Sequence, residues 1–245
     1  MTRRLYLDDE YLISCEATVI AIDDGWLTLS DTVVFPGGGG QPADRVTIEV
    51  AGQTYPNTSV NSSGAVRVEE REDIEVGTLV RCRIDWSFRF ALMRHHALMH
   101  IVNTVGLRSY HGLQTGTQLG PERSRIDFRF PTFDRAWLPK FEEAVNEVIR
   151  RALPIRSEVI TEQEFHARPD LIRTKNVSPP TESGGVRIVE IGDFDAQACG
   201  GTHVRSTEEI GTATVDGFDN KGRENKRIYW VLANDSVDST TIQSG

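Results

Sequence analysis

Short apolar stretches that alternate with polar residues fill residues 1–84 and predict a succession of β-strands. The clearest is Cys15–Ile22, which is followed by an Asp24-Gly25 pair and the run Trp26–Leu29, a pattern typical of a β-hairpin. Further strands are expected at Thr32–Phe35, Val46–Val50, Ala65–Val68 and Leu79–Ile84. Strands this short and frequent, separated by turn residues, predict a small all-β barrel.

The next stretch, Trp86–Val105, contains neither proline nor glycine and predicts a helix. Asp85 or Ser87 can cap its start, and Gly106 stands where the helix should end. A second, amphipathic helix is expected after a cap at Thr132 or Asp134 and ends before Pro154; its apolar positions are Leu138, Phe141, Val145, Val148, Ile149 and Ala152.

Alternation returns between and after these helices, and it predicts further strands and a third, short helix. A Pro/Gly/Ser-rich loop is expected over residues 176–185, and a polar, frayed tail after Asn234. The strands are Ser124–Phe130, Ile155–Ile160, Val186–Ile191, Gly211–Asp216 and Arg227–Leu232, and the short helix is Glu162–Ala167. The pattern predicts an α+β fold: a β-barrel domain over residues 1–85, then a two-layer α/β sandwich over residues 86–245.

Composition narrows the class of protein. A chain of 245 residues, 38% hydrophobic and 26% charged, is typical of a soluble protein with one large or two modest domains. No apolar run reaches the roughly 20 residues of a membrane span, and the N-terminus lacks a signal-peptide core. Three cysteines, an odd and sparse set, favour a reducing cytoplasm.

The net charge of −9 argues against a general nucleic-acid coat but leaves room for a contact confined to one face. The segment 221–227 is locally basic, and its Lys221, Arg223, Lys226 and Arg227 are candidates for a phosphate contact. A second basic set alternates along a predicted strand: Arg123, Arg125 and Arg129. For that set, an ordinary solvated surface explains the pattern equally well.

Two pairs of candidate metal ligands stand out. His96 and His100 lie one helical turn apart on one face, and Cys199 and His203 flank a flexible Gly-Gly-Thr loop. Three imidazoles and a thiolate suit one zinc ion per chain better than magnesium or calcium. Either pair alone is commonly incidental, since a single cysteine is usually a small buried apolar residue. Ala97 after His96 excludes the metalloprotease helix, which needs glutamate there.

The two pairs, in this order, resemble the HxxxH and CGGTH motifs of the alanyl-tRNA editing family. That family contains the editing domain of alanyl-tRNA synthetase and the free-standing AlaX proteins. A second match is the Gly-rich stretch 37–42, similar to the GGGQP loop of the family's N-terminal barrel; no Gly-Lys-Ser/Thr follows, so it is not a P-loop. The threonyl-tRNA synthetase editing domain shares the HxxxH half, but its cysteine motif differs. Ala97 departs from the family, where threonine often follows the first histidine.

The resemblance implies roles for further residues. The Gly-rich loop, with Gly38, Gly39, Gly40 and above all Gln41, would approach the tRNA end or the editing pocket. Gln114, Thr115 and Thr117 match a glutamine-x-glycine-Ser/Thr motif and would lie beside the scissile ester, although an ordinary polar loop is the plain alternative. His95, His111 and His166 have no motif partner and are not assigned to the metal.

The implied activity is zinc-dependent hydrolysis of tRNA(Ala) that wrongly carries serine, or glycine, at its acceptor end. Four candidate ligands would close a zinc ion's coordination, so the sequence leaves open whether zinc activates water or only positions the substrate. It identifies no carboxylate as general base. Thr115 or Thr117 could bond the serine hydroxyl. Alternatives are a deacylase for Ser-tRNA(Thr) and a non-catalytic, zinc-stabilised tRNA-binding module. A chain this short is not expected to use ATP, and its oligomeric state stays open.

Overall fold

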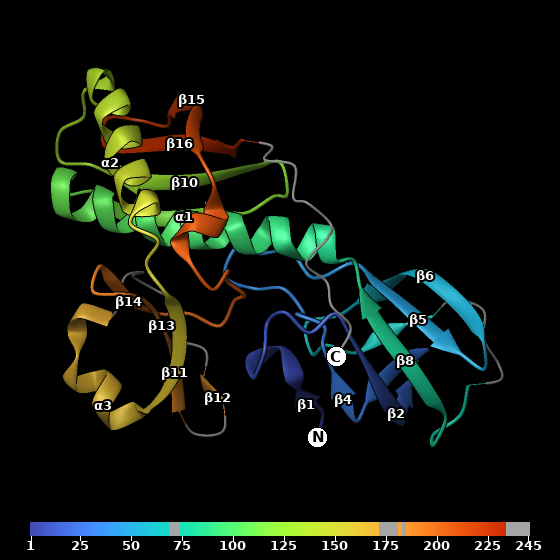
Figure 1. The fold of residues 1–245 in the computed structure, drawn as a ribbon. Coiled ribbons are helices and arrows are strands. Elements are labelled where there is room, and N and C mark those ends of the chain that lie inside the picture. The colour runs from blue at the N-terminus through green and yellow to red at the C-terminus, as the bar shows by residue number, and fades with distance from the viewer. Residues whose placement is uncertain (69–73, 172–180, 183–184, 234–245) are drawn as a thin grey trace.

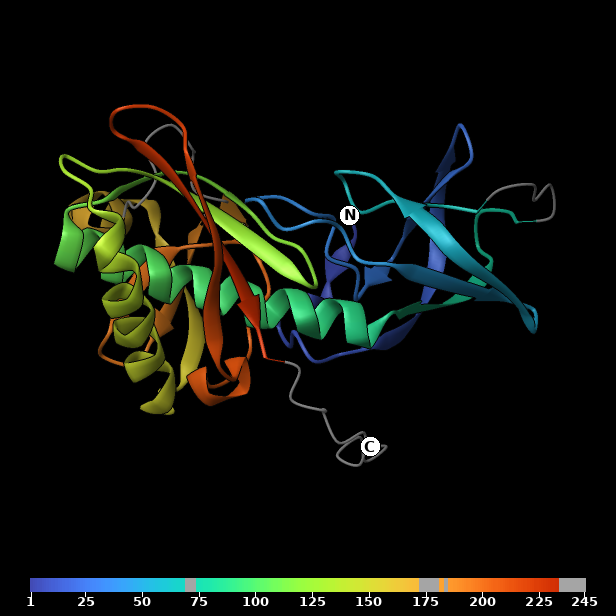
Figure 2. The same ribbon diagram turned by 90° about the horizontal axis from the view of Figure 1, so that it is seen from above.

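The computed structural model describes residues 1–68, 74–171, 181–182 and 185–233, and it shows a mixed α/β fold with a closed barrel (Figures 1 and 2). The predicted fold class is thus confirmed. Most of the expected loop at 176–185 and the tail from Asn234 lie outside the described residues. Among the helices described, none is both long and apolar enough to cross a membrane.

Six strands close the barrel, whose interior is apolar because alternate side chains of each strand point inward. Along the last of them, Val80, Cys82 and Ile84 are buried while their neighbours are exposed. In spatial order the strands are β2 (Ser14–Asp23), β3 (Trp26–Leu29), β7 (Val66–Arg67), β6 (Gln53–Val60), β5 (Val46–Val50) and β8 (Leu79–Ile84). Outside it, β1 (Arg3–Arg4) pairs in parallel with β4 (Asp31–Thr32), and the 3₁₀ turn η1 (Leu5–Leu7) follows β1.

The prediction of a strand over Thr32–Phe35 is wrong beyond Thr32. The backbone groups that would pair with a neighbouring strand are instead hydrogen-bonded to side chains. Phe35 N donates to the Asp44 carboxylate over 2.7 Å, and the Val33 carbonyl accepts from Arg89 Nη2 over 2.8 Å. This segment is buried at the boundary between the barrel and the first long helix.

That helix, α1 (Trp86–Tyr110), begins as predicted, with the Asp85 side chain accepting from Phe88 N. The expected end at Gly106 is wrong: the helix continues to Tyr110, and His111 caps it in the left-handed region at φ +53°. A Cβ on Gly106 would lie 2.7 Å from Phe128 Cζ. Gly106 therefore permits close packing of a strand on the helix and does not terminate it.

α1 runs from the barrel across the rest of the molecule and contacts strands of two sheets (Figure 1). The first sheet is antiparallel, with the order β15 (Ala213–Asn220), β16 (Asn225–Leu232), β10 (Arg123–Arg129) and β9 (Leu113–Gln118). The second contains β11 (Ile155–Thr161), β13 (Gly185–Ile191), β12 (Thr181–Glu182) and β14 (Asp195–Ala198).

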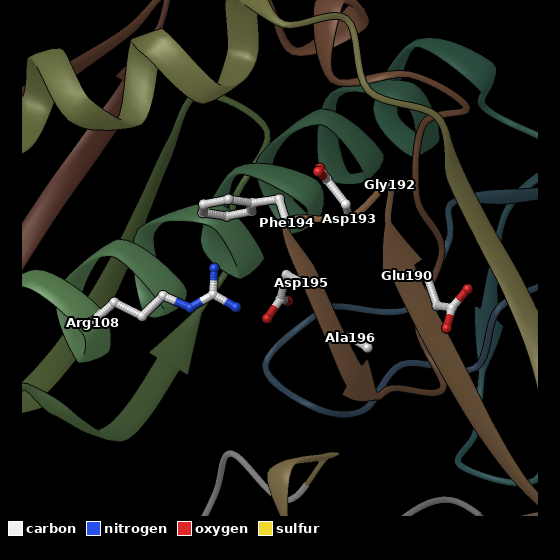
Figure 3. Close-up of a pocket in the computed structure, with 7 residues that line it drawn as sticks. All are labelled: Arg108, Glu190, Gly192, Asp193, Phe194, Asp195 and Ala196. Atoms are coloured by element: carbon white, nitrogen blue, oxygen red, sulfur yellow. The ribbon is translucent and has the colours of Figure 1, made fainter.

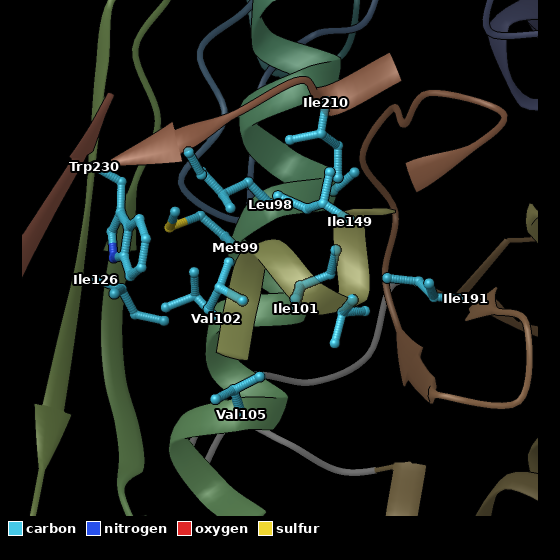
Figure 4. Packing of buried hydrophobic residues seen from close by; sticks show 14 of the residues in the cluster. Leu98, Met99, Ile101, Val102, Val105, Ile126, Ile149, Ile191, Ile210 and Trp230 are labelled. Atoms are coloured by element: carbon cyan, nitrogen blue, oxygen red, sulfur yellow. The ribbon is translucent and has the colours of Figure 1, made fainter. Parts of the chain in front are cut away.

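The second long helix, α2 (Leu138–Arg150), follows the 3₁₀ turn η2 (Arg135–Trp137), which Asp134 caps. Its apolar face joins one large core with α1 and both sheets (Figure 4). Trp230 and Ile126 contribute to that core from the first sheet and Ile191 from the second. The remaining elements are α3 (Glu162–Ala167) and the 3₁₀ turns η3 (Pro169–Leu171) and η4 (Thr207–Ile210). This core holds α1, which carries two of the predicted ligands, in a fixed place.

Candidate metal centre

The four predicted ligands converge. His96 and His100 project from α1, while Cys199 and His203 come from the loop after β14, and the four ligand atoms all lie within 4.8 Å of one another. Cys199 Sγ lies 3.4 Å from His96 Nε2 and 3.6 Å from His203 Nε2. The three imidazoles are buried and Cys199 is half-buried. This group could hold a metal ion.

Arg187, a buried residue of β13, shapes the loop that carries Cys199 and His203. Its Nη1 donates to the carbonyls of Cys199 and Gly201, each over 2.9 Å, and its Nη2 pairs with Glu10 Oε1 over 2.5 Å. Cys199 N donates back to the Arg187 carbonyl over 3.0 Å. The loop is therefore bonded in place by its own sheet and by a residue near the N-terminus.

Burial sets the protonation of these groups. It lowers the pKa of His96 and of His203 well below the usual value, and the charge of His100 or Arg187 nearby lowers it further. Burial raises the pKa of the Cys199 thiol to about 11. Neutral imidazoles are ready to donate to a metal ion, whereas the thiol must lose its proton on binding. The donor chemistry, three imidazoles and one sulfur, fits zinc.

Each histidine of the group has a polar neighbour at Nδ1. Gln41 Oε1 lies 2.8 Å from His96 Nδ1, Asp195 Oδ2 lies 3.9 Å from His100 Nδ1, and Glu10 Oε1 lies 3.8 Å from His203 Nδ1. Sequence reasoning missed Glu10 and Asp195, because nothing in either segment resembles a ligand motif. Burial raises the pKa of the Glu10 carboxyl, although Arg187 acts to lower it.

The Gly-rich loop lies beside this centre; its last three glycines are exposed, but the glutamine that follows them is buried. Gly38, Gly39 and Gly40 are exposed, each with positive φ, whereas Gln41 is 3% exposed. A Cβ on Gly40 would lie 2.5 Å from the Thr117 carbonyl oxygen, and Leu119 N donates to the Gly40 carbonyl over 2.8 Å. The loop thus packs directly on β9, and its glutamine points inward.

The three residues predicted beside the ester all belong to β9, but they do not lie on the same face of it. The pairing of β9 with β10 shifts between Asp127 and Phe128, which makes Thr115 the extra residue of a β-bulge. Thr117 then pairs with Ile126 and Gln114 with Phe128, so both lie on the face of these buried partners. Gln114 Nε2 donates to Thr117 Oγ1 over 2.5 Å. Thr115 is exposed, and its hydroxyl donates to the Asp127 carbonyl over 3.2 Å.

The four basic residues predicted to contact phosphate differ in their bonds. Lys226 is buried and donates to Asn220 Oδ1 and to the carbonyls of Gly222 and Arg223. Arg227 pairs with Asp127 over 2.7 and 2.8 Å. Lys221 and Arg223 are exposed, with Lys221 Nζ 3.7 Å from Asp219. Lys226 thus holds the β15–β16 hairpin together and Arg227 ties β16 to β10, so the exposed pair fits a contact better.

The alternating arginines of β10 are all in ion pairs. Arg123 Nε lies 2.6 Å from Asp216, Arg125 Nη1 2.8 Å from Asp127, and Arg129 Nε 3.4 Å from Glu224. Their pattern is therefore explained without a ligand. His95 is buried and does not belong to the four-residue group; burial and the charge of Arg94 lower its pKa to about 4.

A cavity of about 250 Å³ lies beside the C-terminal part of α1 (Figure 3). Arg108 lines it from α1 and Asp195 from β14, together with Glu190, Gly192, Asp193, Phe194 and Ala196. Asp195 also accepts from Thr104 Oγ1 over 2.7 Å and from Gln197 Nε2 over 2.6 Å. The cavity therefore shares one carboxylate with the surroundings of His100.

Comparison with known proteins finds relatives along most of the chain. Residues 186–229 match the family described as the threonyl and alanyl tRNA synthetase second additional domain. The alanyl-tRNA editing protein AlaX-M of Methanosarcina barkeri is 34% identical over 95% of this chain and 99% of its own length. AlaX-M of Saccharolobus solfataricus is 31% identical over the same shares. The alanine–tRNA ligase of Korarchaeum cryptofilum is 36% identical over 87% of this chain but only 24% of its own length.

Proposed function

The chain belongs to the AlaX family of alanyl-tRNA editing proteins, and on that premise we propose that it hydrolyses the ester of tRNA(Ala) wrongly carrying serine, or glycine. The observation that carries the proposal is the convergence of His96, His100, Cys199 and His203 within 4.8 Å. Beside it, the Gly-rich loop connects the centre to Gln114 and Thr117 on β9.

In this proposal the four residues hold one Zn²⁺, and the neighbouring polar side chains bind the aminoacyl end. When bound, zinc supplies a Lewis acid or lowers the pKa of a water molecule. Gln114 and Thr117 present an amide and a hydroxyl on one face of β9, where they can bond the ester carbonyl or the serine hydroxyl. A site that bonds the hydroxyl leaves its own group unpaired with alanine, which favours hydrolysis of the seryl ester.

The exposed glycines are assigned to the tRNA end. Gly38, Gly39 and Gly40 carry no side chains to obstruct a ribose or phosphate, and Gly40 lies directly against β9. Lys221 and Arg223 are assigned to the phosphate backbone, since Lys226 and Arg227 are occupied by internal bonds.

The metal assignment is tested by His96→Ala, with His166→Ala as the matched control. His166 is an exposed histidine of α3. We expect the His96 variant to fold, to lose zinc, and to deacylate Ser-tRNA(Ala) at least about 100-fold more slowly, the scale of losing one transition-state contact. The control should match the wild type. A folded His96→Ala protein that deacylates at the normal rate would refute the role of the metal.

The phosphate contact is tested by the double variant Lys221→Gln/Arg223→Gln, beside Lys140→Gln on the exposed side of α2. Losing two phosphate contacts should weaken tRNA binding and reduce the slope of log K against log salt by about 1.5. Lys140→Gln should leave that slope in place. If the double variant keeps both the affinity and the slope of the wild type, the contact lies elsewhere.

A second function, a non-catalytic tRNA-binding module stabilised by zinc, is favoured by the number of ligands. Four protein donors fill a tetrahedral zinc ion, as in structural sites, whereas catalytic sites usually keep one position open. Both functions involve zinc and tRNA, so turnover distinguishes them. Stoichiometric zinc with no hydrolysis of Ser-tRNA(Ala) or Ser-tRNA(Thr) would support the binding module.

A further inference from the structure

Gln41 belongs to the N-terminal, barrel side of the molecule, but its side chain lies in the metal centre. It follows the Gly-rich loop between β4 and β5, and its side chain is almost fully buried. Its Oε1 lies 2.8 Å from His96 Nδ1 and 3.2 Å from Thr202 N, while its Nε2 donates to Thr202 Oγ1 over 2.8 Å. A buried amide bonded to a ligand and to the ligand loop is poorly placed to contact tRNA.

The hydrogen-bond pattern determines which atom of each group donates. The backbone N–H of Thr202 can only donate, so the Gln41 atom facing it must be the amide oxygen. That same oxygen faces His96 Nδ1, which must therefore carry the hydrogen. In a neutral imidazole the other nitrogen then has the free lone pair. This nitrogen, Nε2, faces Cys199 Sγ at 3.4 Å.

The ligand loop leaves space for this contact. A Cβ on Gly201 would lie 2.2 Å from His96 Cε1 and 2.9 Å from Gln41 Oε1. A side chain at that position would push the loop away from the imidazole and break the bonds of Gln41 to Thr202. Gly201 is thus required because the His96 ring and the Gln41 amide occupy the space that a side chain would take.

We propose that Gln41 is a positioning residue of the metal centre: it holds the His96 ring with Nε2 directed at the metal, so that a segment preceding the barrel strand β5 sets metal affinity. This inference rests on the proposed metal site. Glu10, another residue from the N-terminal part of the chain, lies 3.8 Å from His203 Nδ1 and is held by Arg187. The centre is thus completed from the N-terminal side at two of its three histidines.

The test compares metal binding by the full chain and its variants without tRNA. Gln41→Met keeps the size of the side chain but removes the acceptor, and Gln41→Asn withdraws the amide by one methylene. Gln41→Glu keeps an acceptor for His96 and Thr202. Gln163→Met, on the exposed surface of α3, is the matched control. Zn²⁺ affinity is measured by competition with a chromophoric chelator, the Co²⁺ spectrum reports ligand geometry, and circular dichroism verifies folding.

We expect Gln41→Met and Gln41→Asn to bind Zn²⁺ about 10- to 100-fold more weakly, the effect of removing an outer partner of a metal-bound histidine, and to change the Co²⁺ spectrum. Gln41→Glu should restore the affinity, and Gln163→Met should equal the wild type. If Gln41→Met fails to fold, Gln41→Asn decides.

Folded variants with the affinity and spectrum of the wild type would overturn the role of Gln41 while leaving the metal site intact. Wild-type protein that binds neither ion would overturn the metal site itself, and this role with it.

Discussion

At the residue scale, the candidate centre depends on groups whose protonation and direction are fixed by their surroundings. Burial keeps His96 and His203 neutral, and Gln41 determines which nitrogen of His96 is free. On β9, a single bulge at Thr115 brings Gln114 and Thr117 to one face although they are three positions apart. Small local features therefore decide which side chains can reach a substrate.

The sequence offered Thr115 and Thr117 equally as partners of the serine hydroxyl, and the bulge distinguishes them. Thr117→Val removes a hydroxyl that bonds Gln114 on the inner face, and we expect the preference for Ser-tRNA(Ala) over Ala-tRNA(Ala) to fall at least about 10-fold, since a lost hydroxyl partner removes discrimination. Thr115→Val is the matched control, because its hydroxyl bonds a backbone carbonyl on the exposed side. Deacylation rates on both substrates measure the preference. Equal effects of the two substitutions would contradict this assignment.

At the element scale, β10 and β16 are tied by a cross-strand ion pair. Arg227 donates to both oxygens of Asp127, and Arg125 donates to one of them. Burial acts to raise the pKa of Asp127, but the bonds to Arg227 and Arg125 outweigh it and lower the pKa overall. Since the folded carboxyl has the lower pKa, its contribution to stability is present above the unfolded value near 4 and is lost as the pH falls through the folded value.

Asp127→Asn should therefore reduce the free energy of unfolding by about 1–2 kcal/mol at pH 7, the scale of partly exposed charged hydrogen bonds. The difference from the wild type should shrink below about pH 4, where the wild-type carboxyl also loses its charge. Asp193→Asn, which breaks a pair whose aspartate is 81% exposed, is the control and should change little. Urea unfolding at several pH values measures this. A loss independent of pH would contradict the ionic origin.

Sequence periodicity predicted the elements with strong apolar patterns. The barrel strands β2, β3, β5 and β8, the start of α1 and the run of α2 follow from alternation or helical spacing. Gly106 was misread, because glycine at a helix end and glycine beneath a strand look alike until Phe128 is placed above it. β6 was not predicted, since Gln53–Val60 is largely polar and contains a proline.

The site was only partly predictable, because sequence patterns record local spacing and not contacts between distant segments. His96, His100, Cys199 and His203 form two motifs with local spacing, whereas the residues around them meet over long sequence separations. Glu10 is joined to Arg187, and Gln41 to Thr202, by contacts that no local pattern records. Asp195 gave no signal either, since a carboxylate four positions before a cysteine is unremarkable until the fold brings it to His100.

At the scale of the whole molecule, Arg89 connects α1 to the barrel side. Its side chain is fully buried, pairs with Asp44, and donates to the carbonyls of Glu10 and Val33 over 3.0 and 2.8 Å. Asp44 also accepts from Phe35 N. One arginine thus fixes the segments that lead to both Glu10 and Gln41, so the centre and the barrel are held in one arrangement.

Arg89→Met should lower the free energy of unfolding by about 3–5 kcal/mol, because it leaves the Asp44 carboxylate buried and unpaired. Arg81→Met, which breaks a pair on the barrel surface whose partners are 56% and 62% exposed, is the control and should cost less than about 0.5 kcal/mol. Denaturant unfolding monitored by tryptophan fluorescence compares them. Similar stabilities of the two variants would show that Arg89 does not hold the parts together.

The measurement that tests the central claim most directly is deacylation of Ser-tRNA(Ala), Ala-tRNA(Ala) and Ser-tRNA(Thr) by one preparation whose zinc content is determined in parallel. We predict rapid loss of serine from tRNA(Ala), slow loss from the other two, and about one zinc per chain, since one group of four ligands is proposed. Zinc bound at that ratio, with no hydrolysis of any of the three substrates, would contradict the editing activity.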